Sequence, residues 1–102
     1  MDVSGMFTVD KVDVKGKSFL GLKVEMKDLP PLLLLKGEKG FVMCGYLNIE
    51  VAEKLGATAA VVSGVKTFED VLNAEIKSAT TKAKSLGLEP GKVVRIVIGA
   101  LA

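Results

Sequence analysis

Alternation between apolar and polar positions is clearest over residues 18–27. Every second residue from Leu20 to Met26 is apolar, and charged residues occupy most of the positions between them. This period of two is typical of a strand in an antiparallel sheet that buries only one face. The pattern therefore predicts a half-buried strand in this segment.

Residues 6–14 have a strand pattern too, but their apolar positions change face between Val9 and Val12. Such a change predicts either a β-bulge or a strand with two different partners. Residues 15–17, Lys-Gly-Lys, form a turn sequence that connects this segment to the alternating one. Residues 6–27 are therefore expected to form a β-hairpin.

The middle of the chain has the pattern of a parallel strand–helix–strand unit. Apolar runs over 32–35 and 41–44 predict two short buried strands, and a third strand of small and β-branched residues is expected over 58–63. Between the last two strands, Asn48 suits a helix N-cap and Gly56 suits a C-cap. A connection of about a dozen residues permits the right-handed crossover between parallel strands.

Helical spacing dominates the last third of the chain. Apolar residues three or four positions apart continue from Phe68 to Leu86 and predict one long helix that begins at Thr67, although residues 73–74 leave open a break into two helices. Residues 93–98 are apolar and mostly β-branched, which predicts a final strand.

Together these elements predict an α+β fold in a single domain over residues 1–102. The expected parts are an N-terminal antiparallel hairpin over 6–27 and a mixed α/β core over 32–98. That core contains a mixed sheet with one βαβ unit and a long packed helix.

The apolar content exceeds what so small a fold is expected to bury. Apolar residues occupy 49% of the 102 positions, and small domains hide a smaller share of their surface than large ones. Surplus apolar surface is usually covered by another subunit. The chain is therefore expected to form a homo-oligomer in which the hairpin over 6–27 is covered by sister copies.

Three features favour a cytoplasmic protein. No apolar run approaches the roughly 20 residues that span a membrane. Residues 1–5 lack the basic and apolar regions of a signal peptide. The single cysteine, Cys44, has no partner for an internal disulfide, which suits a reducing compartment.

Composition excludes several classes of function. The chain has no histidine, which excludes Ser-His-Asp and Cys-His catalysis, and one cysteine without histidine leaves no structural zinc site. Neither the Walker phosphate loop nor the dinucleotide-binding glycine motif occurs, so no cofactor is expected. A net charge of +2 without a basic stripe, and with few aromatic residues, provides no surface for nucleic acid. An all-carboxylate metal site is disfavoured, because acids in the first turn of a helix are ordinary dipole complements; the acids concerned are Glu50, Glu53, Glu69 and Asp70.

Two loops are the best candidates for a binding site. If the strands over 41–44 and 58–63 are adjacent, the loops that follow them meet at the carboxyl edge of the sheet, where open α/β sheets bind ligands. Helix N-termini there offer N–H groups to an anion, glycines expose the backbone, and a lysine adds positive charge. The candidate ligand-binding residues are Gly45, Tyr46, Asn48, Ser63, Gly64, Lys66 and Thr67. Each also has a structural explanation, as a turn glycine, a helix cap, a packed aromatic ring or a solvated lysine.

Cys44 is the one candidate nucleophile, and it ends the strand before the first of these loops. A helix N-terminus nearby would activate its thiol. The alternative is a small apolar residue at the end of a buried strand, which is the favoured interpretation.

A family resemblance is carried by GFVMCGYLNIEVAEKLG over residues 40–56 and by VSGVKTFEDVLNA over residues 62–74. Both stretches are similar to the YunC-like family of small archaeal and bacterial proteins, a domain of unknown function (1805), and the resemblance covers residues from about 20 to 90. It implies that the N-terminal β region, here from Met6 to Met26, mediates tetramerisation. It brings no assigned activity, substrate or catalytic residue. The last stretch of the family is more helical than residues 93–98 indicate.

Three functions are consistent with these features. The first is a non-catalytic oligomeric module that binds a small anionic ligand or a protein partner, favoured by the converging loops and the missing catalytic bases. The second is a thiol-dependent enzyme that uses Cys44. The third is a structural assembly scaffold without a small ligand.

Overall fold

The computed structural model describes residues 6–102, and the expectation about a signal peptide in residues 1–5 lies outside this range. Six strands occur in it: β1 (Phe7–Val14), β2 (Lys17–Val24), β3 (Leu32–Lys36), β4 (Phe41–Met43), β5 (Ala59–Val61) and β6 (Ser78–Ala79). The helices are α1 (Ile49–Lys54), α2 (Phe68–Asn73), α3 (Thr81–Ser85), α4 (Val94–Val97) and the 3₁₀ helix η1 (Ile98–Leu101). Among these helices, none combines the length and the apolar content needed to cross a lipid bilayer.

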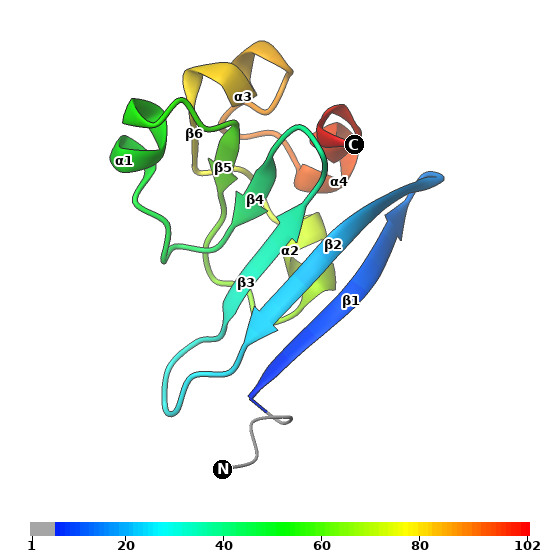
Figure 1. Ribbon diagram of the computed structural model, residues 1–102, viewed down its shortest axis with the longest axis vertical. Helices are drawn as coiled ribbons and strands as arrows, with labels where there is room; N and C mark the ends of the chain where they lie inside the picture. The colour runs from blue at the N-terminus through cyan, green and yellow to red at the C-terminus, as the bar shows by residue number, and fades with distance from the viewer. Residues whose placement is uncertain (1–5) are drawn as a thin grey trace.

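The strands form one mixed sheet in the order β1-β2-β3-β4-β5-β6 (Figure 1). Neighbouring strands are antiparallel except for β4 and β5, which are parallel and joined through α1. The α+β class is therefore confirmed, and so are the N-terminal hairpin and the strand–helix–strand unit.

The hairpin of β1 and β2 is regular along its whole length, so the predicted β-bulge is wrong. Lys15 and Gly16 both have positive φ, 51° and 82°, as in the two-residue hairpin turn whose twist matches its strands. The change of face in β1 has another cause. Val12 packs against the core, whereas Val9 lies on the opposite face and is 55% exposed.

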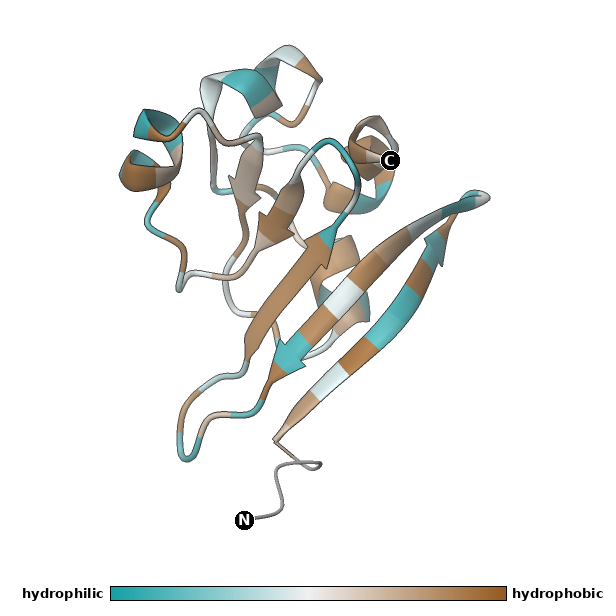
Figure 2. Ribbon diagram, viewed as in Figure 1, coloured by the Kyte–Doolittle hydropathy of each residue, from teal (hydrophilic) through white to brown (hydrophobic). Residues whose placement is uncertain are grey.

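The two faces of the sheet are covered to different extents. On the inner face, α2, α4 and η1 contribute to one apolar core that includes Phe19, Leu33, Leu35, Val42, Val62, Val71, Ile76, Val94, Ile98 and Leu101. On the other side, α1 packs against β5 and the described helices leave β1 and β2 uncovered. We call this side the outer face, and it carries Phe7, Val9, Leu20, Leu22, Val24, Leu32 and Leu34. Figure 2 shows β3 as apolar along most of its length and the hairpin as alternating bands.

The predicted continuous helix over 68–86 is wrong, and the break left open at residues 73–74 occurs. After α2 the chain adds β6 to the edge of the sheet, and the Lys77 N–H donates to a β5 carbonyl at 2.8 Å. Thr80 then begins α3, because its Oγ1 accepts a hydrogen bond from the Ala83 N–H at 3.3 Å. The prediction from helical spacing is wrong here because the backbone N–H and C=O groups at the edge of β5 need hydrogen-bond partners, and residues 77–80 provide them.

The predicted strand over 93–98 is also wrong, because this segment forms α4 and the start of η1. Val94, Ile98 and Leu101 are fully buried while Ile96 is 71% exposed. Burial at spacings of four and three is helical periodicity. Packing onto the core thus overrides the β-branched composition of the segment.

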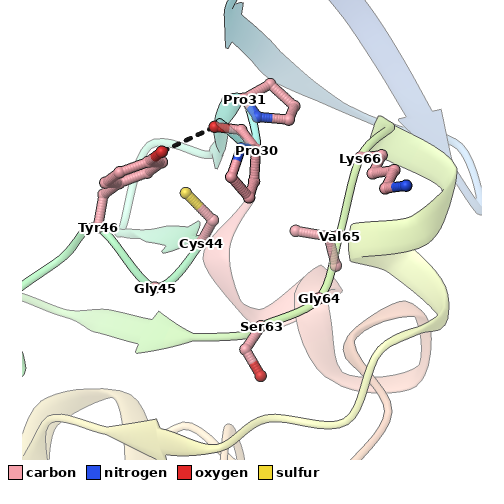
Figure 3. Close-up of a pocket in the computed structure, with 9 residues that line it drawn as sticks. All are labelled: Pro30, Pro31, Cys44, Gly45, Tyr46, Ser63, Gly64, Val65 and Lys66. Atoms are coloured by element: carbon pink, nitrogen blue, oxygen red, sulfur yellow. Dashed lines mark hydrogen bonds between the residues drawn. The ribbon is translucent and has the colours of Figure 1, made fainter. Parts of the chain in front are cut away.

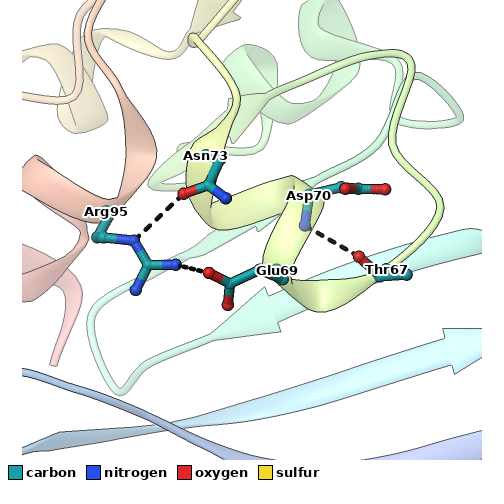
Figure 4. Close-up of polar contacts among 5 residues, drawn as sticks. All are labelled: Thr67, Glu69, Asp70, Asn73 and Arg95. Atoms are coloured by element: carbon teal, nitrogen blue, oxygen red, sulfur yellow. Dashed lines mark hydrogen bonds and ion pairs between the residues drawn. The ribbon is translucent and has the colours of Figure 1, made fainter.

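A polar cluster joins α4 to α2 (Figure 4). The Arg95 guanidinium pairs with the Glu69 carboxylate, and its Nε donates to Asn73 Oδ1 at 3.3 Å. At the start of α2, Thr67 Oγ1 accepts from the Asp70 N–H at 3.0 Å. The Asp70 carboxylate accepts from the Lys66 N–H at 3.0 Å. Both acids of α2 therefore have a structural role, Glu69 in an ion pair between helices and Asp70 in the first helical turn.

Candidate functional site

The site is built on the parallel pair β4 and β5, whose carboxyl ends lie at the same edge of the sheet. The Val62 N–H donates to the Met43 carbonyl at 2.9 Å, and the Cys44 N–H donates to the Leu33 carbonyl at 3.0 Å. These bonds fix the beginning of each loop against its neighbouring strand. The two candidate loops therefore lie next to each other, as the strand–helix–strand pattern predicted.

A cavity of about 400 Å³ opens between these loops and the connection from β2 to β3 (Figure 3). Its walls come from three segments, namely Pro30 with Pro31, residues 44–46 and residues 63–66. The lining is mostly apolar, and no acidic side chain occurs among the described residues that form it. The volume lies at the lower end of the range for small-molecule sites.

Cys44 lies at the end of β4 with only 5% of its surface exposed. Its Sγ points into the space between Tyr46 and Pro30 (Figure 3), and it accepts a hydrogen bond from the Leu33 N–H at 3.4 Å. The chain has no histidine to act as its base. The thiol therefore forms a soft, nearly buried part of the pocket wall.

Tyr46 connects two walls of the pocket. Its hydroxyl donates to the Pro30 carbonyl at 2.8 Å, so the β4–α1 loop is joined to the β2–β3 connection (Figure 3). The residue is 46% exposed. Its ring lines the pocket while its polar end holds the neighbouring loop in place.

The third wall comes from the loop after β5. Gly64 has a φ of 72°, a conformation that favours glycine, and the buried Val65 side chain points toward the pocket (Figure 3). The Ser63 hydroxyl points away from it. Lys66 lies at the rim with its ammonium group directed outward, and it forms no ion pair among residues 6–102.

Asn48 and Thr67 lie outside the pocket and act as helix caps. Asn48 Oδ1 accepts from two N–H groups at the start of α1, at 3.0 and 3.2 Å, and Thr67 caps α2. The Lys66 N–H is also taken, because it donates to Asp70 Oδ2 at 3.0 Å. Several N–H groups that were expected to face an anion thus already have partners within the chain.

The sequence-based interpretation missed Pro30, Pro31 and Val65. The prolines were interpreted only as a break after the hairpin, and their position beside the pocket depends on the strand order β2-β3-β4. No local pattern reports that order. Val65 follows a predicted strand, and its apolar character between Gly64 and Lys66 was the one available signal.

A metal site receives no support from the geometry. Within the described residues, no three cysteine, aspartate or glutamate side chains gather closely enough to hold a metal ion. Glu53 of α1 instead accepts hydrogen bonds from the hydroxyl and the N–H of Thr81, which lower the pKa of its carboxyl group. Glu69 pairs with Arg95 on another element.

Three comparisons relate the chain to known proteins. The model of the family described as Domain of unknown function (DUF1805) matches residues 43–101. The chain is 28% identical over 90 residues to "Uncharacterized protein YunC" of Bacillus subtilis, an alignment that covers 84% of this chain and 88% of that protein. It also resembles the crystal structure of a protein of unknown function, TA1206 from Thermoplasma acidophilum, with a TM-score of 0.89 and 41% identity over 95% of this chain and 94% of that chain. Both loops after β4 and β5 lie inside the range that the family model matches.

Proposed function

The chain belongs to the DUF1805 family, and from that premise we propose that it is a non-catalytic, homo-oligomeric module that binds a small organic anion. The observation that carries the proposal is the cavity of about 400 Å³ between residues 44–46, residues 63–66 and the β2–β3 connection. It is the place where two loops from adjacent parallel strands meet, and ligands of open α/β sheets commonly bind there.

The lining indicates the general chemistry of the ligand. Apolar walls favour an apolar body, since burying such a body is favourable in proportion to its area. Lys66 is the one charged side chain among the described lining residues, and a flexible ammonium group at a rim suits an anionic substituent. We therefore propose a ligand with an apolar body and one negative charge.

The absence of a base supports binding over catalysis. General acid–base chemistry needs a titratable group within hydrogen-bond reach of the reacting atom. The chain contains no histidine, and the described lining contains no carboxylate. Tyr46 and Lys66 are the remaining candidates, and the Tyr46 hydroxyl is already engaged by Pro30.

The outer face supports self-association. Phe7, Val9 and Leu20 are 47%, 55% and 45% exposed on one side of the hairpin. Strands spaced about 4.8 Å apart, with about 3.3 Å per residue, give the four strands β1 to β4 a face of at most roughly 500 Å². This is a modest interface, and we propose that a second copy of the chain covers it.

The geometry of β1 favours covering the face over extending the sheet. Along an antiparallel pair, every second residue of a strand points its N–H and C=O groups to the partner strand. The Glu25 N–H donates to the Met6 carbonyl at 2.8 Å, so the even-numbered residues of β1 point these groups to β2. The Lys11 N–H therefore points to the free edge. Asp10 Oδ1 accepts from that N–H at 2.8 Å. A carboxylate on the strand edge discourages pairing with another strand. We propose that hairpins pack in pairs through their outer faces, and that the tetramer contains two such pairs.

The proposed location is the cytoplasm. Cys44 is a free, buried thiol, and free thiols persist in a reducing compartment.

A thermal-shift and NMR screen of small organic anions tests the binding function. Hits should weaken in Lys66→Ala and remain in Lys54→Ala, which removes the same charge from α1, outside the pocket. The proposal fails if no small organic anion shifts the melting temperature or the resonances of residues 44–46 and 63–66.

A thiol-dependent enzyme is the second candidate, because Cys44 Sγ forms part of the pocket wall. Iodoacetamide labelling of the folded protein distinguishes the two. Labelling that requires unfolding supports a structural thiol, whereas labelling of the folded protein as fast as a free thiol, blocked by a bound anion, would favour the enzyme.

A further inference from the structure

Gly45 is the residue from which the class of ligand can be narrowed. We infer that the pocket binds a flat aromatic monocarboxylate whose ring lies against the bare backbone of the turn at Gly45. The inference rests on the proposed binding function and specifies its ligand.

Nothing in the described chain requires glycine at position 45. Its φ is not positive, and a Cβ built on it meets no atom within 4 Å outside the two neighbouring residues of the chain. Gly37 and Gly40 are different, because a Cβ there would lie 2.0 Å from the Leu101 carbonyl oxygen and 2.3 Å from the Thr58 carbonyl oxygen. Gly64 needs its positive φ of 72°. At position 45, glycine leaves open space beside the peptide backbone, and the residue itself lines the cavity.

The open space suits a flat group. Glycine lets a ligand approach the peptide plane closely, and the other walls carry the rings of Tyr46, Pro30 and Pro31 (Figure 3). An aromatic ring gains contact from such surfaces on both of its faces. A thicker aliphatic body would use the same apolar lining but would approach the turn less closely.

The polar groups of the lining disfavour a sugar, a nucleobase or a peptide. The Tyr46 hydroxyl is bound to Pro30, and the Ser63 hydroxyl points away from the pocket. No buried side-chain polar atom in residues 6–102 lacks a hydrogen-bond partner. A ligand body rich in donors and acceptors would therefore be left partly unsatisfied.

The charge of the lining indicates that the ligand has one negative charge. Lys66 is the single cation of the described lining, and the lining has no acid to repel a carboxylate. Its long, unpaired side chain at the rim has the reach to turn toward a carboxylate whose ring occupies the cavity.

NMR titration with benzoate and 2-naphthoate tests the inference, with cyclohexanecarboxylate as the non-planar probe and benzamide as the uncharged one. Both aromatic acids should bind more tightly than the other two probes. In Gly45→Ala, 2-naphthoate should bind about tenfold more weakly or worse, since the added methyl takes space that the ring needs. Gly99→Ala is the matched control, because a Cβ there makes only ordinary contacts with Lys17, at 3.8 and 3.9 Å; its affinity should be unchanged.

The outcomes separate this inference from the binding function. If cyclohexanecarboxylate binds as tightly as benzoate, or Gly45→Ala keeps the affinity for 2-naphthoate, the aromatic assignment is wrong while the anion site stands. If no organic anion binds, both are wrong. Should Gly45→Ala fail to fold, the wild-type protein decides: nuclear Overhauser effects between Gly45 Hα and the naphthoate ring are expected, and their absence from a saturated complex would overturn the inference.

Discussion

A negative charge at Val9 is the sharpest test of the proposed assembly. Val9 lies on the outer face, on the edge strand β1 opposite Leu22 of β2, and is 55% exposed in the single chain. In the proposed oligomer, the uncovered half of this side chain contacts a sister hairpin. Val9→Glu should therefore leave the fold of the subunit intact and separate the subunits.

The expected magnitude follows from burial. Full burial of a valine side chain contributes about 1.5–3 kcal/mol, so covering the exposed half contributes about 1 kcal/mol per copy. A two-fold interface contains the position twice and would lose about 2 kcal/mol of apolar burial. Two carboxylates left unpaired at the interface cost at least about 1 kcal/mol each. A total of about 4 kcal/mol raises the dissociation constant by roughly a thousandfold.

Sedimentation velocity at micromolar concentration is the assay, and Thr8→Glu is the control. Thr8 is the neighbouring residue on the opposite side of β1, where it faces Lys23 across the strand pair. The control introduces the same charge and should retain the oligomer. A wild-type protein that sediments as a monomer would refute the reasoning, and so would equal dissociation by the two variants while circular dichroism shows both folded.

The remaining predictions concern a loop contact, a carboxyl group and a helix. Tyr46→Phe removes one partly exposed hydrogen bond, so it should cost about 0.5–1 kcal/mol of unfolding free energy and speed protease cleavage in the β2–β3 connection; unchanged cleavage would contradict a holding role. Hydrogen bonds from Thr81 lower the pKa of Glu53 from its ordinary value of 4.5. The stability they contribute is therefore complete above the unfolded-state pKa and is lost as pH falls through the folded-state pKa. In urea titrations, the unfolding free energy of Glu53→Gln should fall less at acid pH than that of the wild type, and the same pH profile in both proteins would contradict this. Val94→Ala should destabilise the protein by about 2–3 kcal/mol and Ile96→Ala by about 0.5 kcal/mol or less, whereas the reverse ranking would contradict helical packing of this segment.

The hairpin and the strand–helix–strand unit were predictable because their signals are local. Alternation over residues 18–27 and the turn sequence at residues 15–17 indicate the hairpin without reference to the rest of the chain. Asn48 and Gly56 mark the two ends of α1 in the sequence, and both act as expected: Asn48 caps the helix and Gly56 follows it with a φ of 74°.

The segments that were predicted wrongly depend on distant partners. Residues 74–80 have helical spacing, but the backbone of residues 77–80 pairs with β5, which precedes α2 in the sequence, and the backbone of residues 74–76 bonds to residues 91–94. Residues 93–98 have strand composition, but Glu75 forms an isolated bridge with Val93 and the chain then turns into a helix over the core. In both cases the tertiary partner, which no local pattern reveals, outweighs intrinsic propensity.

The candidate site was predictable in part for the same reason. The two loops after β4 and β5 follow from the parallel unit, so the sequence pattern alone predicts that Gly45, Tyr46 and Lys66 share one edge of the sheet. The wall from Pro30 and Pro31 follows only from the position of β3 beside β4. Its effect on the chemistry is large, because two proline rings make the pocket more apolar than the loops alone suggested.

The face change in β1 bears on the proposed assembly. In the C-terminal half of the strand, Val12 and Val14 point inward, where they join the core. In the N-terminal half, Phe7 and Val9 point outward, away from the described helices, while Thr8 occupies the inner side. Neighbouring exposed apolar side chains on one face are typical of a surface that another molecule covers. The pattern fits the assembly proposed above, in which β1 packs on its own core at one end and on a sister chain at the other.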